Sequence, residues 1–494
     1  MFPAIKLLGT KTMNILLQIA VMTITLLCGS HARAARPVQD EVDSYIQSEM
    51  RARHIPGLQL AVVRGGKIVM LKSYGLAELP HAIPVSRQSV FSINSATKSF
   101  TGVAIMQLVE QGKLDLAAPL SRYLNDLPAS WQAVTVRQLL NHTSGLPDII
   151  SLQTWQVAAT SHWEAAWRQV QAMPMDFAPG ERFRYNQTNY LLLGKLIDQL
   201  AGQPFAHFIG QRQFQAAGMR HTGYGDLQDV ISHKAPSYRL DQDGSTLKLM
   251  VDDFPAFLRA GAGINASAED LAHWIIALQQ GRLLSQAALV QLWQPGRLND
   301  GRTAPWALGW PVIREQPYRA VAGIGGARSA FTIYPANDLA IVILSNLAGA
   351  SPEQMIDTVA GYFLPGLRKI SGGYAAYRLR RQAEASGFGQ LDQQLAQIRQ
   401  ASGIAPPSEN DVNAWGYRLL RSGRKAQAVA VLALGTRLYP DSFNAHDSLA
   451  EACEASGDTE RAVRHYRRSL ELNAENTHAT GRLRILSPEQ QVAR

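Results

Sequence analysis

The sequence predicts an α+β protein in which strands from both ends of one domain form an antiparallel sheet against a helical subdomain, followed by an all-α region. Three observations support this prediction. Apolar alternation around tight turns predicts hairpins at residues 58–74 and 331–344. The stretch between them, roughly residues 95–290, is mostly helical in its apolar periodicity. A 34-residue repeat near the end of the chain predicts paired helices.

The first residues have the pattern of a secretory leader. Lys6 and Lys11 precede an apolar run over residues 15–27, and Ala32-Arg33-Ala34 follows. The run is shorter than the roughly 20 residues that a membrane span needs. We therefore expect a signal peptide over residues 1–34 and an exported protein, periplasmic or secreted. An acylated or uncleaved anchor at Cys28 is the alternative.

Composition supports a stable globular protein without disulfides. The chain has 494 residues, 46% of them apolar, which predicts two or three globular units. Removal of the leader takes away Cys28 and leaves Cys453 as the only thiol. The three basic residues of the leader also leave, so the net charge falls from +9 to +6. The remaining basic residues are dispersed, so we expect neither nucleic-acid binding nor membrane association beyond export.

The two hairpins define the ends of the sheet. Leu58 to Val63 and Ile68 to Tyr74 flank a glycine-containing turn, and Phe331 to Tyr334 and Leu339 to Leu344 flank another turn at residues 335–338. Such segments, bounded by turn residues, are typical of strands.

The segment Phe91–Lys98 places a serine and a lysine three residues apart where a strand gives way to a helix. Residues i and i+3 share a helix face, so the ammonium of Lys98 is expected beside the hydroxyl of Ser95. A lysine whose pKa is depressed can take the serine proton, and free N–H groups of the first turn can hold an oxyanion. Ser95 and Lys98 are therefore candidates for a nucleophile and its base.

This spacing alone is weak, because chance produces it about once or twice in a chain of this length. Ser245 with Lys248 and Ser422 with Lys425 match equally well, and we interpret both as chance. For Ser95 the structural alternative is a helix N-cap.

Further segments follow Ser95 in a characteristic order, and together they resemble the serine β-lactamases and penicillin-binding-protein-like hydrolases, especially the class C and esterase branch. The resemblance covers roughly residues 38–364. It implies a β-lactamase-like fold with Ser95 in the groove between the sheet and the helical subdomain. The matching segments are Ser95-Ala96-Thr97-Lys98, Leu139 to Pro147, Pro179 to Tyr190, Gly261-Ala262-Gly263-Ile264 and a closing block from Gly323 through Phe331 to Asn346.

The second catalytic element of that family is Tyr-x-Asn, and the resemblance places it at Tyr185-Asn186-Gln187. It implies that Tyr185 shares a proton with Lys98 and passes one to the leaving group. Gln187 replaces the family's asparagine and carries the same donors and acceptor on a longer stem, so we expect it in the substrate-binding set. The alternative for Tyr185 is a core tyrosine among its aromatic neighbours.

The third element departs further from the family, which has a lysine, histidine or tryptophan two residues before a glycine. This chain has Gly323-Ile324-Gly325-Gly326. The resemblance implies that Gly325 lets the backbone approach a substrate and that the N–H of Gly326 is the second oxyanion donor, beside that of Ser95. Arg328 is the nearest positive charge that would hold a substrate carboxylate, and a surface arginine is the alternative.

Other catalytic chemistry finds little support. In the resembling family the His142 segment is a structural turn, so we do not expect a catalytic base there. A His-Glu-x-x-His motif and a Gly-x-Ser-x-Gly elbow are both absent from the sequence. We expect no metal and no cofactor.

Beyond residue 366 the chain changes character. Residues 367–407 are predicted to form a helical linker, and residues 408–494 resemble tetratricopeptide repeats. Such repeats bind a peptide or another subunit, and a helical appendage packed on the hydrolase domain is the alternative. The pairs that recur 34 residues apart are Trp415 with Leu449, Gly416 with Ala450, Gly423 with Gly457, Ala428 with Ala462, and Leu438 with Leu472.

These expectations combine into an exported serine hydrolase, over residues 35–366, that forms an acyl-enzyme on Ser95. Its substrate is a small molecule or a peptide: an ester, a small amide, a D-amino-acid peptide or a β-lactam. The altered third element weakens the choices that depend on a carboxylate. The rival is a catalytically degenerate protein that binds a ligand or partner through its repeats, a possibility that Gln187 and Gly323 keep open.

Overall fold

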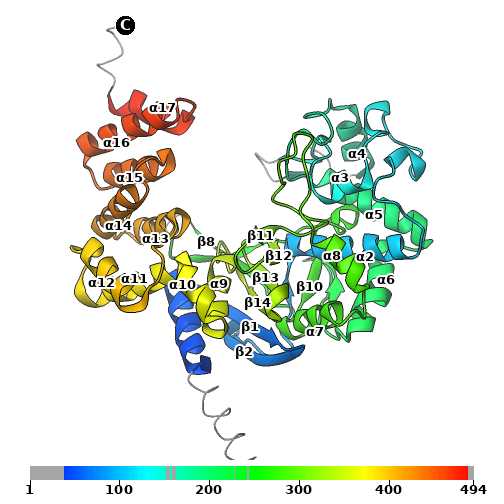
Figure 1. The fold of residues 1–494 in the computed structure, drawn as a ribbon, viewed down its shortest axis with the longest axis horizontal. Coiled ribbons are helices and arrows are strands. Elements are labelled where there is room, and N and C mark those ends of the chain that lie inside the picture. The colour runs from blue at the N-terminus through cyan, green and yellow to red at the C-terminus, as the bar shows by residue number, and fades with distance from the viewer. Residues whose placement is uncertain (1–37, 152–155, 158–162, 227, 242–243, 488–494) are drawn as a thin grey trace, which may run out of the picture. The chain divides into compact units, whose positions relative to one another are not determined.

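The structure is a computed structural model that describes residues 38–151, 156–157, 163–226, 228–241 and 244–487. The predicted signal peptide and Cys28 lie outside the described residues. The chain divides into two compact units, residues 1–49 and 50–494. In the described part of the first unit, residues 38–49 are helical. The elements below belong to the second unit (Figure 1).

An antiparallel sheet joins the two ends of the predicted hydrolase domain. Strand β1 pairs with β2 on one side and with β14 on the other, and Leu60 of β1 lies opposite Ile343 of β14. This confirms that both predicted hairpins contribute to one sheet. In spatial order the strands are β11 (Val312–Arg314), β12 (Ala320–Gly325), β13 (Ser329–Tyr334), β14 (Leu339–Ser345), β1 (Gly57–Arg64), β2 (Lys67–Glu78) and β3 (Ile83–Pro84).

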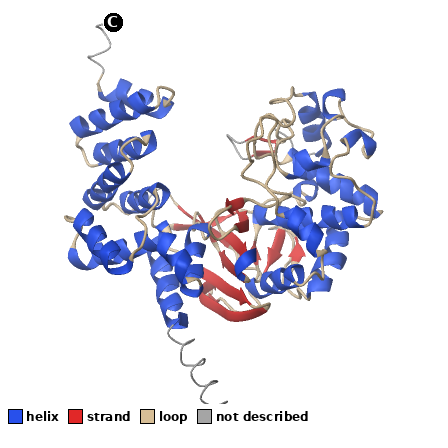
Figure 2. Cartoon of the chain, viewed as in Figure 1, coloured by secondary structure: helices blue, strands red, loops and turns tan. Residues whose placement is uncertain are grey.

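Both faces of the main sheet are buried, and helices pack against them. Ala340, Val342 and Leu344 of β14 belong to the same core as Trp274 of α7 (Ala268–Gln279). Since successive side chains alternate, Ile341 and Ile343 face the other side, and both are fully buried. Helix α9 (Glu353–Phe363) also packs on β13 and β14. Figure 2 shows the strands with helices beside them.

The helical subdomain surrounds α2 (Thr97–Glu110), which follows the short 3₁₀ turn η1 (Asn94–Ala96). Every residue of α2 from Thr97 to Leu108 is buried, so the helix is enclosed rather than half exposed. Helices α5 (Thr188–Ala201), α6 (Phe205–Ile209) and α8 (Gln286–Leu292) pack on α2, and the subdomain also contains α3 (Val136–Leu140) and α4 (Trp163–Ala172).

Short strands complete the domain. Pairs and triplets of strands link the loops around the subdomain, and one of them, β10, pairs with the strand that leads into η1. These strands are β4 (Phe91–Ser92), β5 (Ile150–Ser151), β6 (Gln156–Val157), β7 (Gly223–Tyr224), β8 (Ser237–Leu240), β9 (Leu247–Met250), β10 (Ile264–Ala266) and β15 (Leu347–Ala348).

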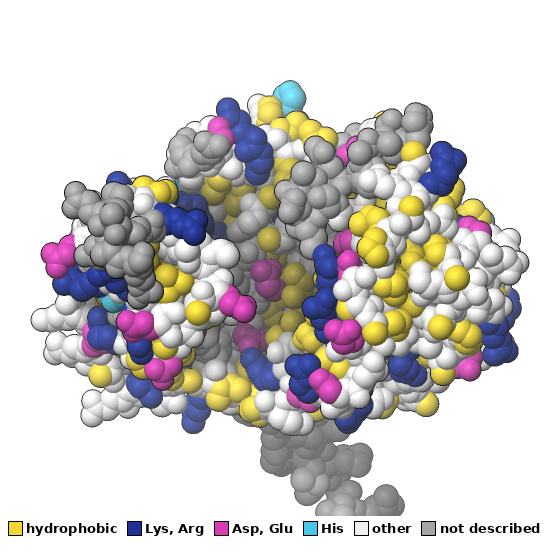
Figure 3. All heavy atoms as spheres, turned by 90° about the horizontal axis from the view of Figure 1, so that it is seen from above, with side chains coloured by type: hydrophobic (Ala, Val, Ile, Leu, Met, Phe, Trp, Pro, Cys, Tyr) yellow, Lys and Arg dark blue, Asp and Glu magenta, His cyan; other side chains and the backbone are white. Residues whose placement is uncertain are grey.

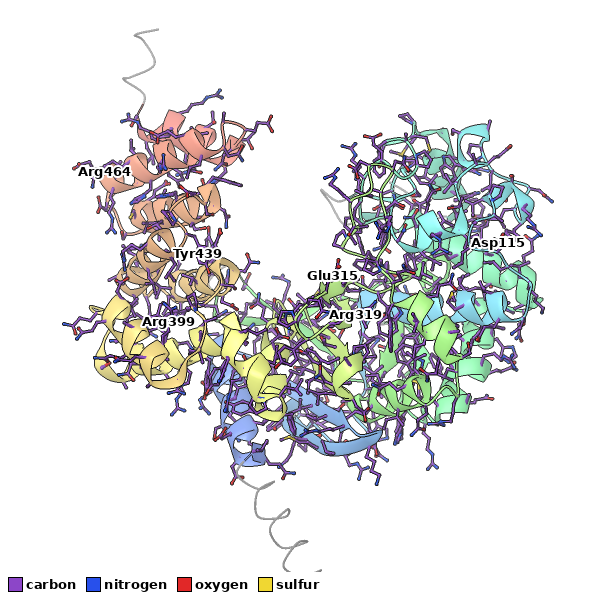
Figure 4. All side chains as sticks on the ribbon, viewed as in Figure 1. Asp115, Glu315, Arg319, Arg399, Tyr439 and Arg464 are labelled. Carbon is purple, nitrogen blue, oxygen red and sulfur yellow. The ribbon has the colours of Figure 1, made fainter. Side chains whose placement is uncertain are left out.

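The rest of the second unit is all-helical, as predicted. An added Cβ at Gly416 would lie 2.4 Å from Leu432, so α13 and α14 cross closely at a small residue. Tyr439, which is labelled in Figure 4, directly follows α14. Its hydroxyl donates to the carbonyl of Pro407 at 2.7 Å. The helices are α10 (Pro365–Ile370), α11 (Gly372–Ser386), α12 (Leu391–Ser402), α13 (Glu409–Arg421), α14 (Lys425–Leu438), α15 (Phe443–Ala455), α16 (Thr459–Leu472) and α17 (Thr477–Leu486).

The segment predicted as a linker contains two helices, α11 and α12, that pack on each other. The tetratricopeptide assignment of residues 408–494 stays a prediction. None of the helices in the described ranges is long and apolar enough to cross a bilayer. Figure 3 shows basic and acidic side chains interspersed over the face in view, rather than a single basic stripe.

Candidate active site

Ser95 lies in η1, at the entrance to α2, where it is only partly buried. The N-cap interpretation of this serine is wrong. The residue at the N-cap of α2 is Ala96, the N-cap of η1 is Ile93, and neither turn has a side-chain cap. Ser95 therefore sits at the junction without a capping role, as a nucleophile at a strand-to-helix turn would.

Lys98 is fully buried in the first turn of α2, three residues after Ser95. Its Nζ donates to Oε1 of Gln187 and to the carbonyl of Gly261, both at 2.9 Å. The same ammonium lies 4.7 Å from the ring centre of Tyr185 and 4.9 Å from that of Tyr190. Two acceptors and two aromatic faces compensate a charge that burial alone would make very unfavourable.

Tyr185 differs from its neighbour Tyr190. Tyr190 is fully buried and donates to the carbonyl of Leu140 at 3.0 Å, so it is the core tyrosine of the pair. Tyr185 is partly exposed, and its buried hydroxyl makes no hydrogen bond to any described residue. The Tyr185 ring lies beside Lys98 and its phenol is unengaged, and its role as a proton carrier stays a prediction.

Behind Tyr185 lies a neutral histidine. The His142 ring is 4.6 Å from the Tyr185 ring, and Trp306 packs 5.4 Å from Tyr185. Complete burial, helped by the charge of Lys98, lowers the pKa of His142 well below its usual value. Its Nδ1 accepts from the N–H of Asn186 at 3.2 Å, which ties the turn to the Tyr185 loop. This arrangement fits the predicted structural role.

Gln187 reaches Lys98 despite its longer stem, and its own backbone is held by Asp148. Oδ1 of Asp148 accepts from the N–H of Gln187 at 3.0 Å. Burial raises the pKa of Asp148, while hydrogen bonds from the N–H groups of Ile150 and Gln187 oppose that rise. The side-chain amide is therefore aimed at the lysine by an anchored backbone.

The end of β12 approaches the nucleophile closely. A Cβ at Gly325 would lie 1.9 Å from the carbonyl of Ile93 and 2.9 Å from the amide nitrogen of Ser95. Only glycine permits this contact. Gly326 follows with a φ of +57° and is exposed. The end of β12 thus lies against Ser95, and the assignment of the N–H groups of Ser95 and Gly326 as oxyanion donors stays a prediction.

At Gly323 an aromatic ring takes the space of the missing side chain. A Cβ there would lie 2.2 Å from Cζ of Phe331. Phe331 itself packs on Trp274 and Trp310 in the core. A cation at this position would require Phe331 to move, so the departure from the family pattern is built into the packing.

The surface interpretation of Arg328 is wrong, and the ion pair that it makes bears on its predicted role at the substrate. The side chain is 3% exposed, so it is not a surface arginine. Its guanidinium makes a bidentate pair with Asp252, at 2.7 and 2.9 Å, and it donates to Oδ1 of Asn94 at 2.9 Å. With two guanidinium nitrogens engaged inside the protein, Arg328 is not available to hold a substrate carboxylate.

Three residues near the site were missed in the sequence. Asp252 and Asp148 had no signal for a place near the site, because the site residues that they contact, Arg328 and Gln187, lie far along the chain. Asn94 did have a local signal, because an asparagine directly before Ser95 indicates a possible left-handed backbone. In the structure its φ is +48°. Within the described residues, no group of three or more His, Cys, Asp or Glu side chains is arranged to hold a metal ion.

The site combines a serine at a strand-to-helix turn with a buried lysine three residues on. A tyrosine and the end of a sheet strand lie beside them. This arrangement defines a class of protein: hydrolases that transfer acyl groups through a serine. The comparison with known families agrees. The Beta-lactamase family model matches residues 42–361, and the chain belongs to this family.

The relatives have matching descriptions. Protein flp of Staphylococcus aureus (strain MW2) is 27% identical over 333 residues, covering 66% of each chain. Penicillin-binding protein 4* of Bacillus subtilis (strain 168) is 32% identical over 282 residues, covering 53% of this chain and 61% of that protein. The match thus spans somewhat less than two thirds of these relatives.

Among solved structures, the penicillin-binding protein from Bacillus halodurans is 27% identical, with a TM-score of 0.54. That alignment covers 65% of this chain and 98% of the other.

Proposed function

We propose that this chain is an exported serine hydrolase that works through an acyl-enzyme on Ser95. The observation that carries the proposal is the setting of Lys98, which is buried one turn from Ser95, between the acceptors of Gln187 and Gly261 and beside Tyr185. An ammonium is rarely buried without a function or a carboxylate partner, and the two acceptors and the tyrosine named here are neutral.

The proposed reaction has two halves. In the first, Lys98 acts as the neutral amine: Oγ of Ser95 attacks the carbonyl carbon of the substrate and its proton passes to Lys98, which returns one to Tyr185 after the tyrosine has protonated the leaving group. The N–H groups of Ser95 and Gly326 stabilise the oxyanion, and the leaving group departs with a proton from the tyrosine. In the second, water attacks the acyl-enzyme, the same residues return the proton to Ser95, and the acid is released.

The preferred substrate is an ester or small amide rather than a β-lactam or a D-amino-acid peptide. The two positions from which a cation was expected to hold a carboxylate do not supply one. Phe331 fills the space beside Gly323, and Asp252 engages Arg328. Both features favour an acyl donor without a carboxylate next to the reacting carbonyl.

A labelling experiment tests the nucleophile. The mature protein is incubated with a fluorophosphonate and, separately, with a penicillin, and adducts are measured by intact mass. We expect one fluorophosphonate adduct per chain, lost in Ser95→Ala, together with a fall in ester turnover of at least about 10³-fold. Ser245→Ala is the matched control, because it removes the serine of an equivalent Ser-x-x-Lys segment, and it should label normally.

Other outcomes would redirect the proposal. A penicillin adduct on Ser95 would favour cell-wall-type substrates over simple esters. No adduct from either reagent on folded protein would remove the hydrolase proposal. If a tight protein partner were then lost on deletion of residues 408–494, the binding-protein alternative would replace it.

Export has its own test. We expect the protein recovered outside the cytoplasm to begin at Ala35, as measured by N-terminal sequencing or intact mass. A chain that keeps its first residues, or one carrying a lipid on Cys28, would contradict cleavage after Ala34.

A further inference from the structure

Arg328 links two parts of the proposed active site that come from distant segments of the chain. Its guanidinium is buried and paired with Asp252, whose Oδ2 also accepts from Oγ of Ser237 at 2.6 Å. Nη2 of Arg328 makes a further bond, at 2.9 Å, to Oδ1 of Asn94. The arginine is thus fixed by its carboxylate on one side and holds the residue before Ser95 on the other.

Asn94 needs such a tether. Its φ of +48° lies in the left-handed region, which residues with a Cβ seldom adopt and asparagine adopts more readily than most. Besides the contact with Arg328, its side chain donates to the carbonyl of Ser92 at 3.2 Å. Because Asn94 directly precedes Ser95 in η1, the amide contact constrains the backbone that carries the N–H of Ser95.

The same arginine belongs to the turn that carries the other N–H. Residues 325–328 form a tight turn in which the N–H of Arg328 donates to the carbonyl of Gly325 at 3.0 Å. Gly326 and Ala327 have φ values of +57° and +49°. A Cβ at Gly326 would lie 2.8 Å from the Asn94 amide and 3.2 Å from Nε of Arg328, so both side chains pack directly under this turn.

We propose that Arg328, held by Asp252, is a positioning residue that fixes the separation of the two oxyanion donors through Asn94. This inference rests on the proposed function, since it assigns a task to the same site. An oxyanion hole works because its donors are in place before the charge develops, and small displacements weaken it. The buried guanidinium of Arg328 contacts Asn94, the residue before Ser95, and packs under Gly326. It would therefore hold the N–H groups of Ser95 and Gly326 at a fixed separation.

The decisive variants are Asn94→Gly and Arg328→Met. Glycine adopts the left-handed conformation freely, so the Asn94→Gly variant should fold. It lacks the side-chain amide oxygen that accepts from Arg328. For both we expect kcat for a neutral ester to fall about tenfold or more with KM within about threefold, because the donors act on the transition state. The inhibition constant of a boronic acid, which forms a tetrahedral adduct on serine, should rise by the same factor. Arg328→Lys should be intermediate.

Two comparisons separate positioning from general loss of stability. Arg314 also pairs with an aspartate, Asp357, at the same sheet, but no contact of it reaches η1 among the described residues. Arg314→Met should therefore leave kcat unchanged. Combining Asn94→Gly with Arg328→Met should lower kcat no further than the worse single change, since both break one link.

The outcomes are distinguishable. If the wild-type protein labels at Ser95 and Asn94→Gly keeps full kcat, the positioning role is wrong while the proposed hydrolase stands. If Arg328→Met raises KM for carboxylate-bearing substrates and leaves kcat intact, the arginine contacts substrate and the inference is also wrong. If Arg328→Met fails to fold, Asn94→Gly decides the question. Failure of the wild-type protein to label removes the proposed function itself.

Discussion

Lys98 shows how a single residue constrains its surroundings. Its ammonium is buried with no direct salt bridge to a described carboxylate, and it contacts two neutral oxygens and two aromatic rings. Each contact requires the neighbouring backbone to come close. At Gly261 the approach is so close that an added Cβ would lie 2.9 Å from Oε1 of Gln187 and 3.3 Å from Nζ of Lys98.

A methyl group at Gly261 should therefore impair activity more than stability. In Gly261→Ala the end of a flexible side chain, that of Gln187, can move away, so we expect the fold to be retained with a stability loss of about 1 kcal/mol. The displaced amide no longer orients Lys98, and kcat for an ester should fall at least about tenfold. Turnover and thermal melting measured together check this.

The matched control is Gly210→Ala, where an added Cβ meets no atom within 4 Å in the described structure. It should preserve both kcat and melting temperature. Normal turnover in Gly261→Ala would show that the Gln187 contact is dispensable.

At the residue scale the sequence was informative where the contacts are local or the resemblance is close. Ser95 and Lys98 are three residues apart, and the structure brings Tyr185 and Gln187 to them as expected. Arg328 was misjudged because its partners, Asp252 and Asn94, are 76 and 234 residues away along the chain. Whether an arginine is free or neutralised depends on such partners, and no local pattern reports them.

At the scale of elements, tight turns and helix pairs set the chemistry of individual groups. Helices α15 and α16 pack on each other and bring the two Nδ1 atoms of His446 and His465 to 3.0 Å. Burial, with His446, Arg461 and Arg464 nearby, lowers the pKa of His465 from 6.5 to about 4. Protonation of this ring is therefore less favourable in the folded helix pair than in the unfolded chain.

We expect the α15–α16 pair to lose stability in mild acid. The contribution of His465 is fully present above pH 6.5, falls as the pH drops below that value, and is lost near pH 4. Since the ring is partly exposed, the loss between pH 7 and pH 5 should be about 1 kcal/mol. Hydrogen exchange of the helix pair at the two pH values measures it.

His465→Gln should abolish most of this pH dependence, whereas His81→Gln, which changes a largely exposed histidine of the hydrolase domain, should leave it intact. Equal acid sensitivity in the His465→Gln variant would mean that other groups cause the loss.

Most elements were predictable because their signals are strong. The two hairpins stand between turn residues, and both appear with their expected pairing. Helix α2 is buried on all sides over Thr97–Leu108, although its sequence contains polar residues. These residues are bonded inside the protein, as when Thr101 donates to the carbonyl of Ala260 at 2.6 Å. A helix at the centre of a domain can keep polar residues if each has a partner.

At the scale of the whole molecule, stability must come from packing rather than from cross-links. The sequence contains two cysteines, Cys28 and Cys453. Cys453 is a buried free thiol on α15, and burial raises the pKa of its sulfhydryl. Since Cys28 belongs to the predicted leader, the mature protein should contain one slow-reacting thiol.

We expect the mature chain to react with about one equivalent of an aromatic disulfide reagent after denaturation and with far less when native, because only the exposed thiolate reacts readily. Its melting temperature should not change with reductant. Cys453→Ala provides the control, with no reaction in either state. Two thiols per denatured chain would show that the leader is retained.

The pairing of β1 with β14 has a consequence for how the protein reaches its active state. These strands lie near opposite ends of the hydrolase domain, so the sheet closes only after a very long loop has been brought together. Long-range pairing of this kind slows folding. Gly325, on the late part of the chain, must reach Ser95, on the early part, before an oxyanion could be held. Refolding protein should thus regain a reactive serine in its last and slowest phase, after most helical structure has returned.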